Sequence, residues 1–348
     1  MTTSGPDADR LTRSLVIPPE HAGRRLDQAV AALLPEFSRS RLKAWIVDGE
    51  LRVDGREARP RERVEAGQTV ELDTAAPTPG AVAAQPLSLD VVHTDADLLV
   101  INKPAGLVVH PGAGNPDHTL QNGLLHHDPG LVALPRCGIV HRLDKDTTGL
   151  MVVARTPRAH VVLVAALAAR RIRREYLALC HGEFSGGGTV DAPITRHPRD
   201  RLKMAVQPGG REAVTHYRLL CRFRGLALLR VRLETGRTHQ IRVHMAHLRH
   251  PLVGDPVYGG RQRVPPGLTP QLRAQVAGFG RQALHAWRLA LEHPVTGEPL
   301  AWQAPPPEDM TALLEALVAD SAERGGGVSA TLPRGLFDPD VAVDGDDT

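Results

Sequence analysis

The stretch His141-Arg142-Leu143-Asp144-Lys145-Asp146-Thr147-Thr148-Gly149, near the middle of the chain, is its most informative segment. An apolar run, residues 150–154 (LMVVA), follows at once, so we expect a polar turn that enters a buried strand. A carboxylate in such a place is costly to desolvate unless a cation or hydrogen bonds hold it. Asp144 is therefore a candidate nucleophile or base, and an aspartate that only caps a turn beside an arginine is the alternative.

Four further blocks stand around this stretch and span most of the chain. They are residues 102–112 (NKPAGLVVHPG), 174–176 (REY), 234–244 (ETGRTHQIRVH) and 250–259 (HPLVGDPVYG). Together with residues 141–149 they resemble the signature of RNA pseudouridine synthases, in the ribosomal large-subunit branch that carries an N-terminal S4 domain. The resemblance runs from about residue 24 to about residue 310, and Thr148 keeps the hydroxyl where many members have serine.

The resemblance implies a reaction that needs one carboxylate and no cofactor. Pseudouridylation breaks the bond between uracil N1 and ribose C1′, rotates the base and joins its C5 to C1′, so no electrons and no external group are exchanged. Asp144 matches the reactive aspartate of the family. The sequence leaves open whether this carboxylate attacks covalently or removes a sugar proton.

Three positions near Asp144 receive roles from the same resemblance. Arg237 matches the arginine that pairs with the catalytic aspartate and would keep Asp144 ionised in a dry pocket. Tyr176 matches the tyrosine that stacks on the target base, and its hydroxyl could assist proton removal; a half-buried strand tyrosine is the alternative. Leu233 or Ile241 would form an apolar wall of the pocket, with core packing as the equal alternative.

Basic side chains in these blocks are candidates for RNA contacts. Arg142 matches the residue that fills the gap left by a flipped uridine, and a plain ion pair with a nearby aspartate is the alternative. Arg173 and Arg174, in the stretch 170–174 (RRIRR), would hold phosphates at the mouth of the site or form a solvated helix end. Lys103 lies in a tight Lys-Pro-Ala-Gly turn, where it either contacts RNA or only shapes the loop.

The histidines between residues 239 and 250 suggest a metal site at first sight. Positions 244, 247 and 250 do not share one helix face, however, and no ordered acidic ligand accompanies them, so no metal is expected. His239 and His244 are instead expected to hydrogen-bond the loop around Arg237.

The N-terminal region has the pattern of a small RNA-binding module. Apolar residues at 26, 29, 30, 33 and 34 form one helical face, and Ser38 is placed to cap a second helix. A short strand, 51–53, then precedes an Asp54-Gly55 turn. Two helices followed by strands look like an S4 domain, and an α/β module without an RNA role is the alternative. The candidate RNA-binding residues there are Arg39, Arg41, Lys43 and Arg52.

These patterns predict an α+β protein: a small S4-like RNA-binding domain, then a pseudouridine synthase catalytic domain with a mixed, largely antiparallel sheet. The expected limits are 14–73 for the S4-like domain, 74–86 for a linker, 87–320 for the catalytic domain and 321–348 for an acidic, disordered tail. In the catalytic domain we expect strands over 98–101, 174–180 and 227–234, a helix over 157–170 with Thr156 as its cap, a hairpin over 284–302 and a last helix over 309–319. Thr238 is expected to cap a further helix that contains Ile241 and Met245.

Charge and composition agree with an RNA partner. The net charge is +3, and residues 321–348 hold six acidic and two basic side chains, a net of −4, so the remainder carries +3 − (−4) = +7. A basic body suits a polyanion, although a generally arginine-rich proteome explains the charge equally well. Three cysteines without CxxC spacing indicate a reducing compartment. No secretory signal and no transmembrane run is found, so we expect a cytoplasmic protein without membrane contact, and a monomer.

The sequence thus predicts an enzyme that isomerises uridines in 23S rRNA, in the region of helix 69, on free rRNA or within a large-subunit particle. The alternatives are the same chemistry at another rRNA site or on tRNA, and a non-catalytic ribosome-assembly factor that binds RNA. A metal hydrolase built on the histidines is a third, weaker possibility.

Overall fold

The chain divides into two compact units, Met1–Ala83 and Ala84–Thr348, which are described separately. The structure is a computed structural model that describes residues 10–35, 37, 39–75, 82–112, 115–200, 202–260, 264–323, 332 and 336. Residues 76–81 of the expected linker and position 38, the expected helix cap, lie outside these residues. The domain limits derived from the sequence therefore remain proposals.

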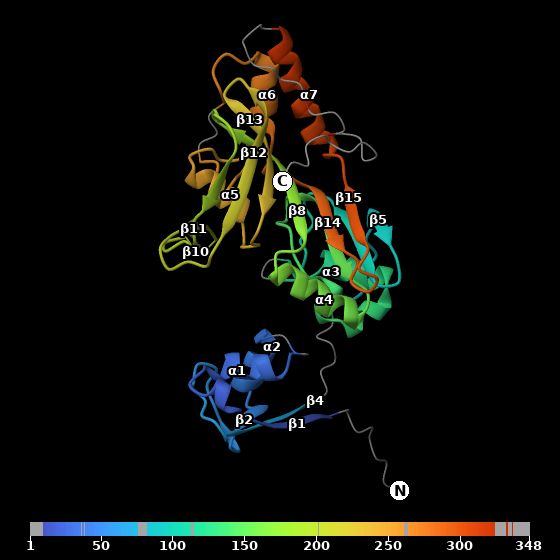
Figure 1. The fold of residues 1–348 in the computed structure, drawn as a ribbon, viewed down its shortest axis with the longest axis vertical. Helices are drawn as coiled ribbons and strands as arrows, with labels where there is room; N and C mark the ends of the chain where they lie inside the picture. The colour runs from blue at the N-terminus through green and yellow to red at the C-terminus, as the bar shows by residue number, and fades with distance from the viewer. Residues whose placement is uncertain are drawn as a thin grey trace. The chain divides into compact units, whose positions relative to one another are not determined.

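Two helices pack on a four-stranded sheet in the N-terminal unit (Figure 1). The helices are α1 (Leu26–Leu33) and α2 (Arg39–Val47). The sheet has the order β1 (Arg10–Val16), β4 (Thr69–Ala75), β2 (Leu51–Val53) and β3 (Arg56–Glu57), and all its pairs are antiparallel. The apolar face expected in α1 is buried at residues 26, 29, 30 and 34, which pack with the inner side chains of α2 and the sheet. Burial of this face, rather than helix propensity, stabilises so short a helix.

The turn between β2 and β3 is the one that the sequence predicts. Asp54 and Gly55 both have positive φ, 51° and 74°, as the two central residues of a type I′ hairpin require. The Asp54 side chain accepts a hydrogen bond from Thr69 N at 2.8 Å, so the aspartate also fastens the turn to β4.

A long mixed sheet forms the second unit, as Figure 1 shows. Its neighbouring strands are, in order, β5 (Val91–Thr94), β6 (Leu98–Lys103), β7 (Thr148–Ala154), β14 (Leu284–Glu292), β8 (Arg173–His181), β13 (Leu226–Leu233), β12 (Val214–Phe223) and β9 (Gly188–Asp191), with β15 (Pro299–Gln303) also on β14. The pair β7–β14 is parallel, and the other pairs are antiparallel. The predicted α+β class with a largely antiparallel sheet is confirmed.

Gly149 allows β7 and β14 to come together directly after the Asp144 turn. Its φ is +112°, and a Cβ at this position would lie 2.2 Å from the carbonyl oxygen of Ala286. A residue with a side chain would force the two strands apart. Beside it, the Thr148 hydroxyl lies 2.8 Å from Nδ1 of buried His285, so the hydroxyl noted in the sequence fastens the same strand pair.

Helices cover the sheet in two places. Helix α4 (Pro157–Ala168) buries residues 159, 163 and 166 against β6, β7 and β14, and the predicted cap is confirmed because Thr156 Oγ1 accepts from Ala159 N. Helices α6 (Pro270–Gly278) and α7 (Glu308–Glu323) pack in a second core with β8, β12 and β13. Sequence patterns did not predict α6, α3 (Leu120–His127) or the small hairpin of β10 (Ile194–Arg196) and β11 (Met204–Val206), and they predicted α5 (Gln240–His247) with a different cap.

The end of the second unit differs from the expected tail. Helix α7 continues to Glu323, beyond the expected limit at 320, and Leu336 is 1% exposed in the core that also contains Leu313 and Leu317. Leu336 contributes apolar area to this core, and Leu332 packs against it as a partly buried side chain. The prediction that the tail is disordered is therefore wrong at these residues. The remainder of 324–348, apart from Leu332, lies outside the described residues.

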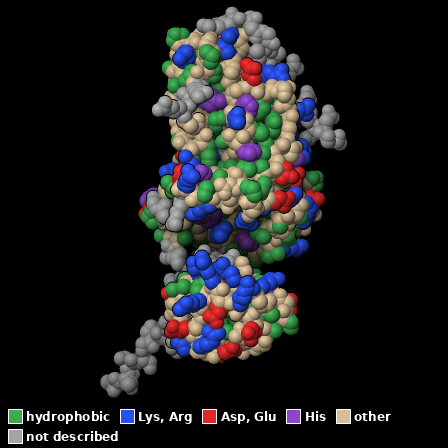
Figure 2. All heavy atoms as spheres, turned by 90° about the vertical axis from the view of Figure 1, so that its left-hand side faces the viewer, with side chains coloured by type: hydrophobic (Ala, Val, Ile, Leu, Met, Phe, Trp, Pro, Cys, Tyr) green, Lys and Arg blue, Asp and Glu red, His purple; other side chains and the backbone are tan. Residues whose placement is uncertain are grey.

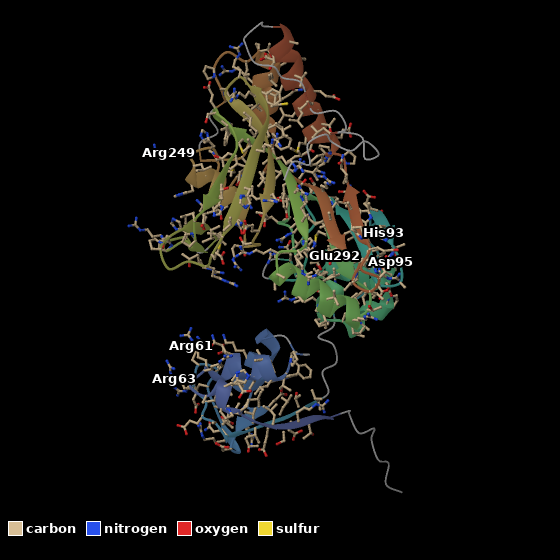
Figure 3. All side chains as sticks on the ribbon, viewed as in Figure 1. Arg61, Arg63, His93, Asp95, Arg249 and Glu292 are labelled. Carbon is tan, nitrogen blue, oxygen red and sulfur yellow. The ribbon has the colours of Figure 1, made fainter. Side chains whose placement is uncertain are left out.

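A small polar cluster joins two hairpins at one end of the sheet (Figure 3). The Asp95 carboxylate, in the β5–β6 turn, lies 3.0 Å from His93 Nε2 and 3.3 Å from His293 Nε2, at the β14–β15 turn. The cluster holds the edge strands together away from the residues of the site described below. Among the helices that the structure describes, none is long and apolar enough to cross a membrane.

Candidate active site

Asp144 lies at the wall of a cavity of about 490 Å³ within the second unit. The residue belongs to the turn that leads into β7, in which Thr147 N donates to the Asp144 carbonyl at 3.1 Å. Its side chain is 17% exposed, so the carboxylate is largely removed from solvent but can be reached from the cavity. The predicted polar turn before a buried strand is confirmed, because all seven residues of β7 are buried.

Arg242, and not Arg237, forms the ion pair with Asp144. The distance from Arg242 Nη1 to Asp144 Oδ2 is 2.9 Å. The Arg237 side chain also lines the cavity, but its Nε donates to the carbonyl of Glu212 at 2.8 Å. The predicted Arg237–Asp144 pair is therefore wrong. The reason is geometric: Arg242 projects from the first turns of α5, whereas Arg237 belongs to the loop before this helix.

The loop around Arg237 is held by a glutamine rather than by the expected threonine cap. Gln240 Oε1 accepts from Arg237 N at 2.9 Å and from the Thr235 hydroxyl at 2.7 Å. The N-cap of α5 is His239, in the left-handed region with φ 57°, and its side chain makes no capping hydrogen bond. The buried amide of Gln240 therefore holds the loop that precedes α5, and the expected cap by Thr238 is not formed.

A second carboxylate holds Arg242 in place from behind. Asp255 is 1% exposed and accepts from Arg242 Nε at 2.7 Å and from Nη2 at 2.9 Å, which is bidentate geometry. The amides of Val257 and Tyr258 also donate to Asp255. Burial alone would raise the pKa of Asp255, but the hydrogen bond and charge of Arg242 and these amides lower it below its ordinary value. The row Asp255–Arg242–Asp144 therefore links the Asp144 carboxylate to helix α5.

The two histidines do not contact the Arg237 loop in the way that we expected. His239 Nδ1 lies 2.8 Å from the Tyr258 hydroxyl, and His239 Nε2 lies 3.9 Å from Asp144 Oδ1. Burial lowers the pKa of His239, so the ring faces Asp144 in its neutral form. His244 is buried and contacts the Thr215 hydroxyl and the Ala192 carbonyl, at 2.8 and 2.9 Å. His239 is therefore part of the site, and His244 is part of the core.

Tyr176 and the two apolar residues also line the cavity, together with Asp144. Tyr176 stands on the central strand β8 and is 5% exposed, and burial raises the pKa of its hydroxyl. Leu233 ends β13, and Ile241 lies in α5. An aromatic face and two aliphatic side chains beside a carboxylate suit a flat, partly polar ligand such as a nucleobase.

The predicted RNA-binding arginines take different positions. Arg142 lines the cavity, and no ion pair with Asp144 or Asp146 is found among the described contacts. Arg174 lines the cavity and is 8% exposed. Arg173 pairs instead with the buried Glu175, from its Nε to Oε1 at 2.7 Å, and does not line the cavity. Of these three arginines, Arg142 and Arg174 therefore face the space that a nucleotide would enter.

Lys103 does not contact RNA, because its ammonium group is buried. The residue is 1% exposed, and its Nζ donates to the carbonyls of Pro104, Leu107 and Lys145 at 2.7, 3.0 and 2.8 Å. Burial lowers its pKa to about 7, against the opposing charges of Asp146 and Asp144. The prediction of an RNA contact is wrong, and the alternative, a lysine that shapes the loop, is what the structure shows. Through Lys145 it fastens the turn that carries Asp144.

We expect Lys103→Met to lower the free energy of unfolding by about 2–4 kcal/mol and to slow turnover. Three carbonyls would lose their donor, among them the buried carbonyl of Leu107, and an unsatisfied buried group costs roughly 1–3 kcal/mol. Urea unfolding measures the first effect. Lys145→Met is the matched control, since that side chain is exposed and its loss should change stability by less than about 0.5 kcal/mol. Equal stability of the two variants would contradict the assigned role.

The residues that sequence reasoning missed are Arg242, Asp255, Tyr258 and the orientation of His239 toward Asp144. All of them lie in blocks 234–244 and 250–259, so the sequence motifs did include these residues. The useful clue was that Asp255 and Tyr258 follow Gly254 in a polar turn and that Arg242 falls between apolar side chains on a helix. A charged residue on a buried helix face needs a charged partner.

A carboxylate held by an arginine at the wall of a cavity, beside a buried tyrosine, is an arrangement typical of an enzyme active site, with Asp144 as the candidate reactive group. Comparison with known families specifies it further. Residues 97–247 match the family described as RNA pseudouridylate synthase, and residues 24–70 match the S4 domain. Relatives named as pseudouridine synthases are also more than half identical to this chain over nine tenths of its length, so the chain belongs to the RNA pseudouridylate synthase family.

Relatives and a solved structure agree with this assignment. The ribosomal large subunit pseudouridine synthase D of Xanthomonas campestris is 57% identical over 90% of this chain and 95% of its own length. The protein of the same name from Escherichia coli K12 is 51% identical over 91% of this chain and 97% of its own length. The structure of human RNA Pseudouridylate Synthase Domain Containing 4 is 28% identical, covers 65% of this chain and 92% of its own, and has a TM-score of 0.50.

Proposed function

We propose that this enzyme isomerises uridines to pseudouridines in the 23S rRNA of the large ribosomal subunit, in the region of helix 69. The observation that carries the proposal is the Asp144–Arg242 pair at the wall of a cavity that Tyr176 also lines. The large-subunit target is supported by the names of relatives that are more than half identical over nine tenths of the chain. The same proposal has the enzyme act as a cytoplasmic monomer.

The geometry supports a mechanism in which the target base leaves its stack. A stacked uridine hides C1′ and C5, so the base has to be flipped into the cavity, whose volume of about 490 Å³ suits one nucleotide. Tyr176 would lie against the uracil ring, and Arg142 would fill the gap left in the RNA. Arg242 pairs with Asp144 and holds its carboxylate at the cavity wall, where both covalent attack and removal of a sugar proton require it.

The decisive experiment maps pseudouridines in rRNA and tRNA from a deletion strain. Carbodiimide labelling should show that helix 69 pseudouridines are lost and return with the wild-type gene. Loss at another rRNA or tRNA position would keep the chemistry and change the target, and an unchanged pattern throughout would contradict the proposal. Purified protein, given a helix 69 stem-loop or assembled large subunits, identifies the form of the substrate.

A separable role in ribosome assembly is the second candidate, because exposed basic side chains gather on a unit that contributes no residue to the cavity. Lys and Arg side chains lie on the face of the N-terminal unit seen in Figure 2, and Arg61 and Arg63 extend from this unit in Figure 3. Complementation of the deletion strain with Asp144→Asn tests it. Normal growth without pseudouridine would establish a binding role apart from catalysis. If growth is restored only when pseudouridine is restored, the separate assembly role is excluded.

The N-terminal unit is expected to add RNA affinity without changing chemistry. Lys43 and Arg52 are exposed there, and Arg39 and Arg41 precede Lys43 in helix α2, although their side chains lie outside the described set. The double variant Lys43→Gln, Arg52→Gln should bind RNA more weakly, with a log–log salt slope lower by roughly 0.7–0.9 for each phosphate that the protein no longer neutralises. The rate at saturating RNA should change little.

Filter binding across a salt series measures this effect. Arg224→Gln is the matched control, since Arg224 is an exposed arginine in the β12–β13 turn, at the opposite end of these strands from the cavity residues 212 and 233–237. An unaltered salt slope in the double variant would contradict the assignment of these two residues to RNA binding.

A further inference from the structure

Arg174 is a buried charge without an anionic partner among the residues that the structure describes. The residue begins the buried part of β8, is 8% exposed and lines the same cavity as Asp144. Its Nε is fully buried without a hydrogen-bond acceptor, and no carboxylate among the described residues forms an ion pair with its guanidinium. Arginine stays protonated in proteins, so this burial destabilises the free enzyme unless an anion is supplied.

The other arginines near Arg174, in contrast, do have anionic partners. Arg173 and Arg230 both pair with the buried Glu175, at 2.7 and 2.9 Å. Arg242 forms ion pairs with both Asp144 and Asp255. The neighbouring carboxylates are therefore already paired, and Arg174 alone of this group faces the open cavity without an anion among the described side chains.

His141 supplies a second unsatisfied donor on the cavity wall. Val152 N donates to His141 Nε2 at 3.1 Å, so the ring proton of the neutral histidine is on Nδ1. This Nδ1 is buried and has no acceptor among the described residues. Burial, followed by the charge of Arg174, lowers the pKa of His141 to about 3, so the ring stays neutral at physiological pH. The charge of Arg174 acts on this ring because the two side chains are close.

Gly236 leaves room for the guanidinium. A Cβ at this position would lie 3.0 Å from Arg174 Nη1, and no other heavy atom of the described residues is found within 4 Å of it. Any larger residue at this position would therefore press on Arg174. The turn thus keeps a space in which the guanidinium can meet a ligand.

We propose that Arg174 and His141 form a phosphate subsite inside the cavity, which binds the phosphodiester adjoining the target uridine. The inference rests on the proposed function, since it takes RNA as the occupant. A uracil carbonyl would accept hydrogen bonds from Arg174 and His141 but would leave the buried charge of Arg174 uncompensated. The oxygens of a phosphate would accept these hydrogen bonds and also compensate the charge. Arg174 would therefore position the nucleotide, while Asp144 performs the chemistry.

The test uses stem-loop RNAs in which one phosphate, 5′ or 3′ of the target uridine, is replaced by an uncharged methylphosphonate. For wild type, one of the two replacements should raise Kd by about 10- to 100-fold, the value of a charge-assisted hydrogen bond. Arg174→Met should bind unmodified RNA with a similar loss and show no further loss with that methylphosphonate. Equal losses in both enzymes at both positions would overturn the inference.

Thermal unfolding of the free proteins gives a second, independent readout. Arg174→Met removes an unpaired buried charge and should raise Tm, whereas a side chain that only supports the fold would lower it. Arg173→Met is the control: it breaks the pair with Glu175, should lower Tm, and should keep the sensitivity to the methylphosphonate. Gly236→Ala should weaken RNA binding in the same phosphate-specific way, because the new methyl group displaces Arg174 Nη1.

The outcomes separate the inference from the function on which it rests. Failure of wild type to form pseudouridine on unmodified RNA would contradict the proposed function. If wild type does form pseudouridine, but Arg174→Met lowers Tm and remains sensitive to the methylphosphonate, the phosphate subsite alone is wrong.

Discussion

Asp144→Asn is expected to reduce turnover by at least about 10⁴-fold, the loss seen when an enzyme's nucleophile or base is removed. The amide keeps the shape of the side chain in the turn before β7, but it can neither attack C1′ nor accept a proton. RNA binding should persist within a few-fold, because the proposed phosphate contacts are made by other side chains, among them Arg174, and not by Asp144. The free protein should remain folded, since Arg242 keeps its bidentate partner Asp255.

The measurement is a single-turnover assay with enzyme in excess over RNA, so that slow product release cannot hide the chemical step. Asp146→Asn is the matched control, two residues along the same turn, since Asp146 does not line the cavity and should keep most of the activity. Detectable pseudouridine formation by Asp144→Asn, with Asp144→Ala behaving alike, would overturn the assignment and favour the RNA-binding role.

Arg242→Met should be nearly as damaging, and it should also destabilise the fold. Loss of the arginine removes the cation that pairs with Asp144 and holds its carboxylate in place, so activity falls steeply. It also leaves Asp255, 1% exposed, without its counterion, and breaking one side of a buried pair costs about 3–5 kcal/mol. Arg237→Met should lower activity much less, because Arg237 contacts the Glu212 carbonyl and not Asp144.

The pH dependence of this variant follows from Asp255. In the wild type its pKa is lowered, so the pair with Arg242 stabilises the fold above the ordinary pKa of an aspartate and loses this effect as pH falls through the lowered value. In Arg242→Met, burial is no longer opposed by the cation, and the carboxyl takes up a proton more readily. The stability deficit of the variant should therefore be largest at neutral pH and shrink in acid.

Urea unfolding at several pH values measures this deficit. The double variant Arg242→Met, Asp255→Leu provides the matched comparison, because an apolar pair replaces the buried ion pair and should recover much of the lost stability but none of the activity. A deficit that grew in acid, or a double variant less stable than Arg242→Met, would contradict the role assigned to Asp255.

Local features of this chain were predictable from the sequence, and side-chain partners across the fold were not. The buried face of α1, the Asp54-Gly55 hairpin and the Thr156 cap depend on neighbouring residues, so periodicity and turn chemistry were sufficient. Asp144 was found through its motif. The choice between Arg237 and Arg242 depends on where α5 begins, at Gln240, which determines the arginine that points toward the β7 turn.

Lys103 is a second residue whose side-chain partners could not be predicted from the sequence. Lysine is almost always exposed, so a surface contact was the reasonable expectation, and nothing local indicated that three carbonyls from two separate loops would surround its ammonium group. These hydrogen bonds can be recognised only once the fold has placed the end of β6 beside the turn before β7.

The position of β14 has a consequence for how the protein is made. This strand, residues 284–292, lies between β7 and β8, which carry the Asp144 turn and Tyr176. Each of the two strands therefore lacks the neighbour on one of its edges until the chain is synthesised through residue 292. The sheet of the N-terminal unit uses only residues 10–75 and can close long before. During synthesis, β7 and β8 are then apolar strands with open edges, and pairings over such long sequence separations form slowly. The nascent chain is most exposed to mispairing while the residues between β8 and β14 are still being added.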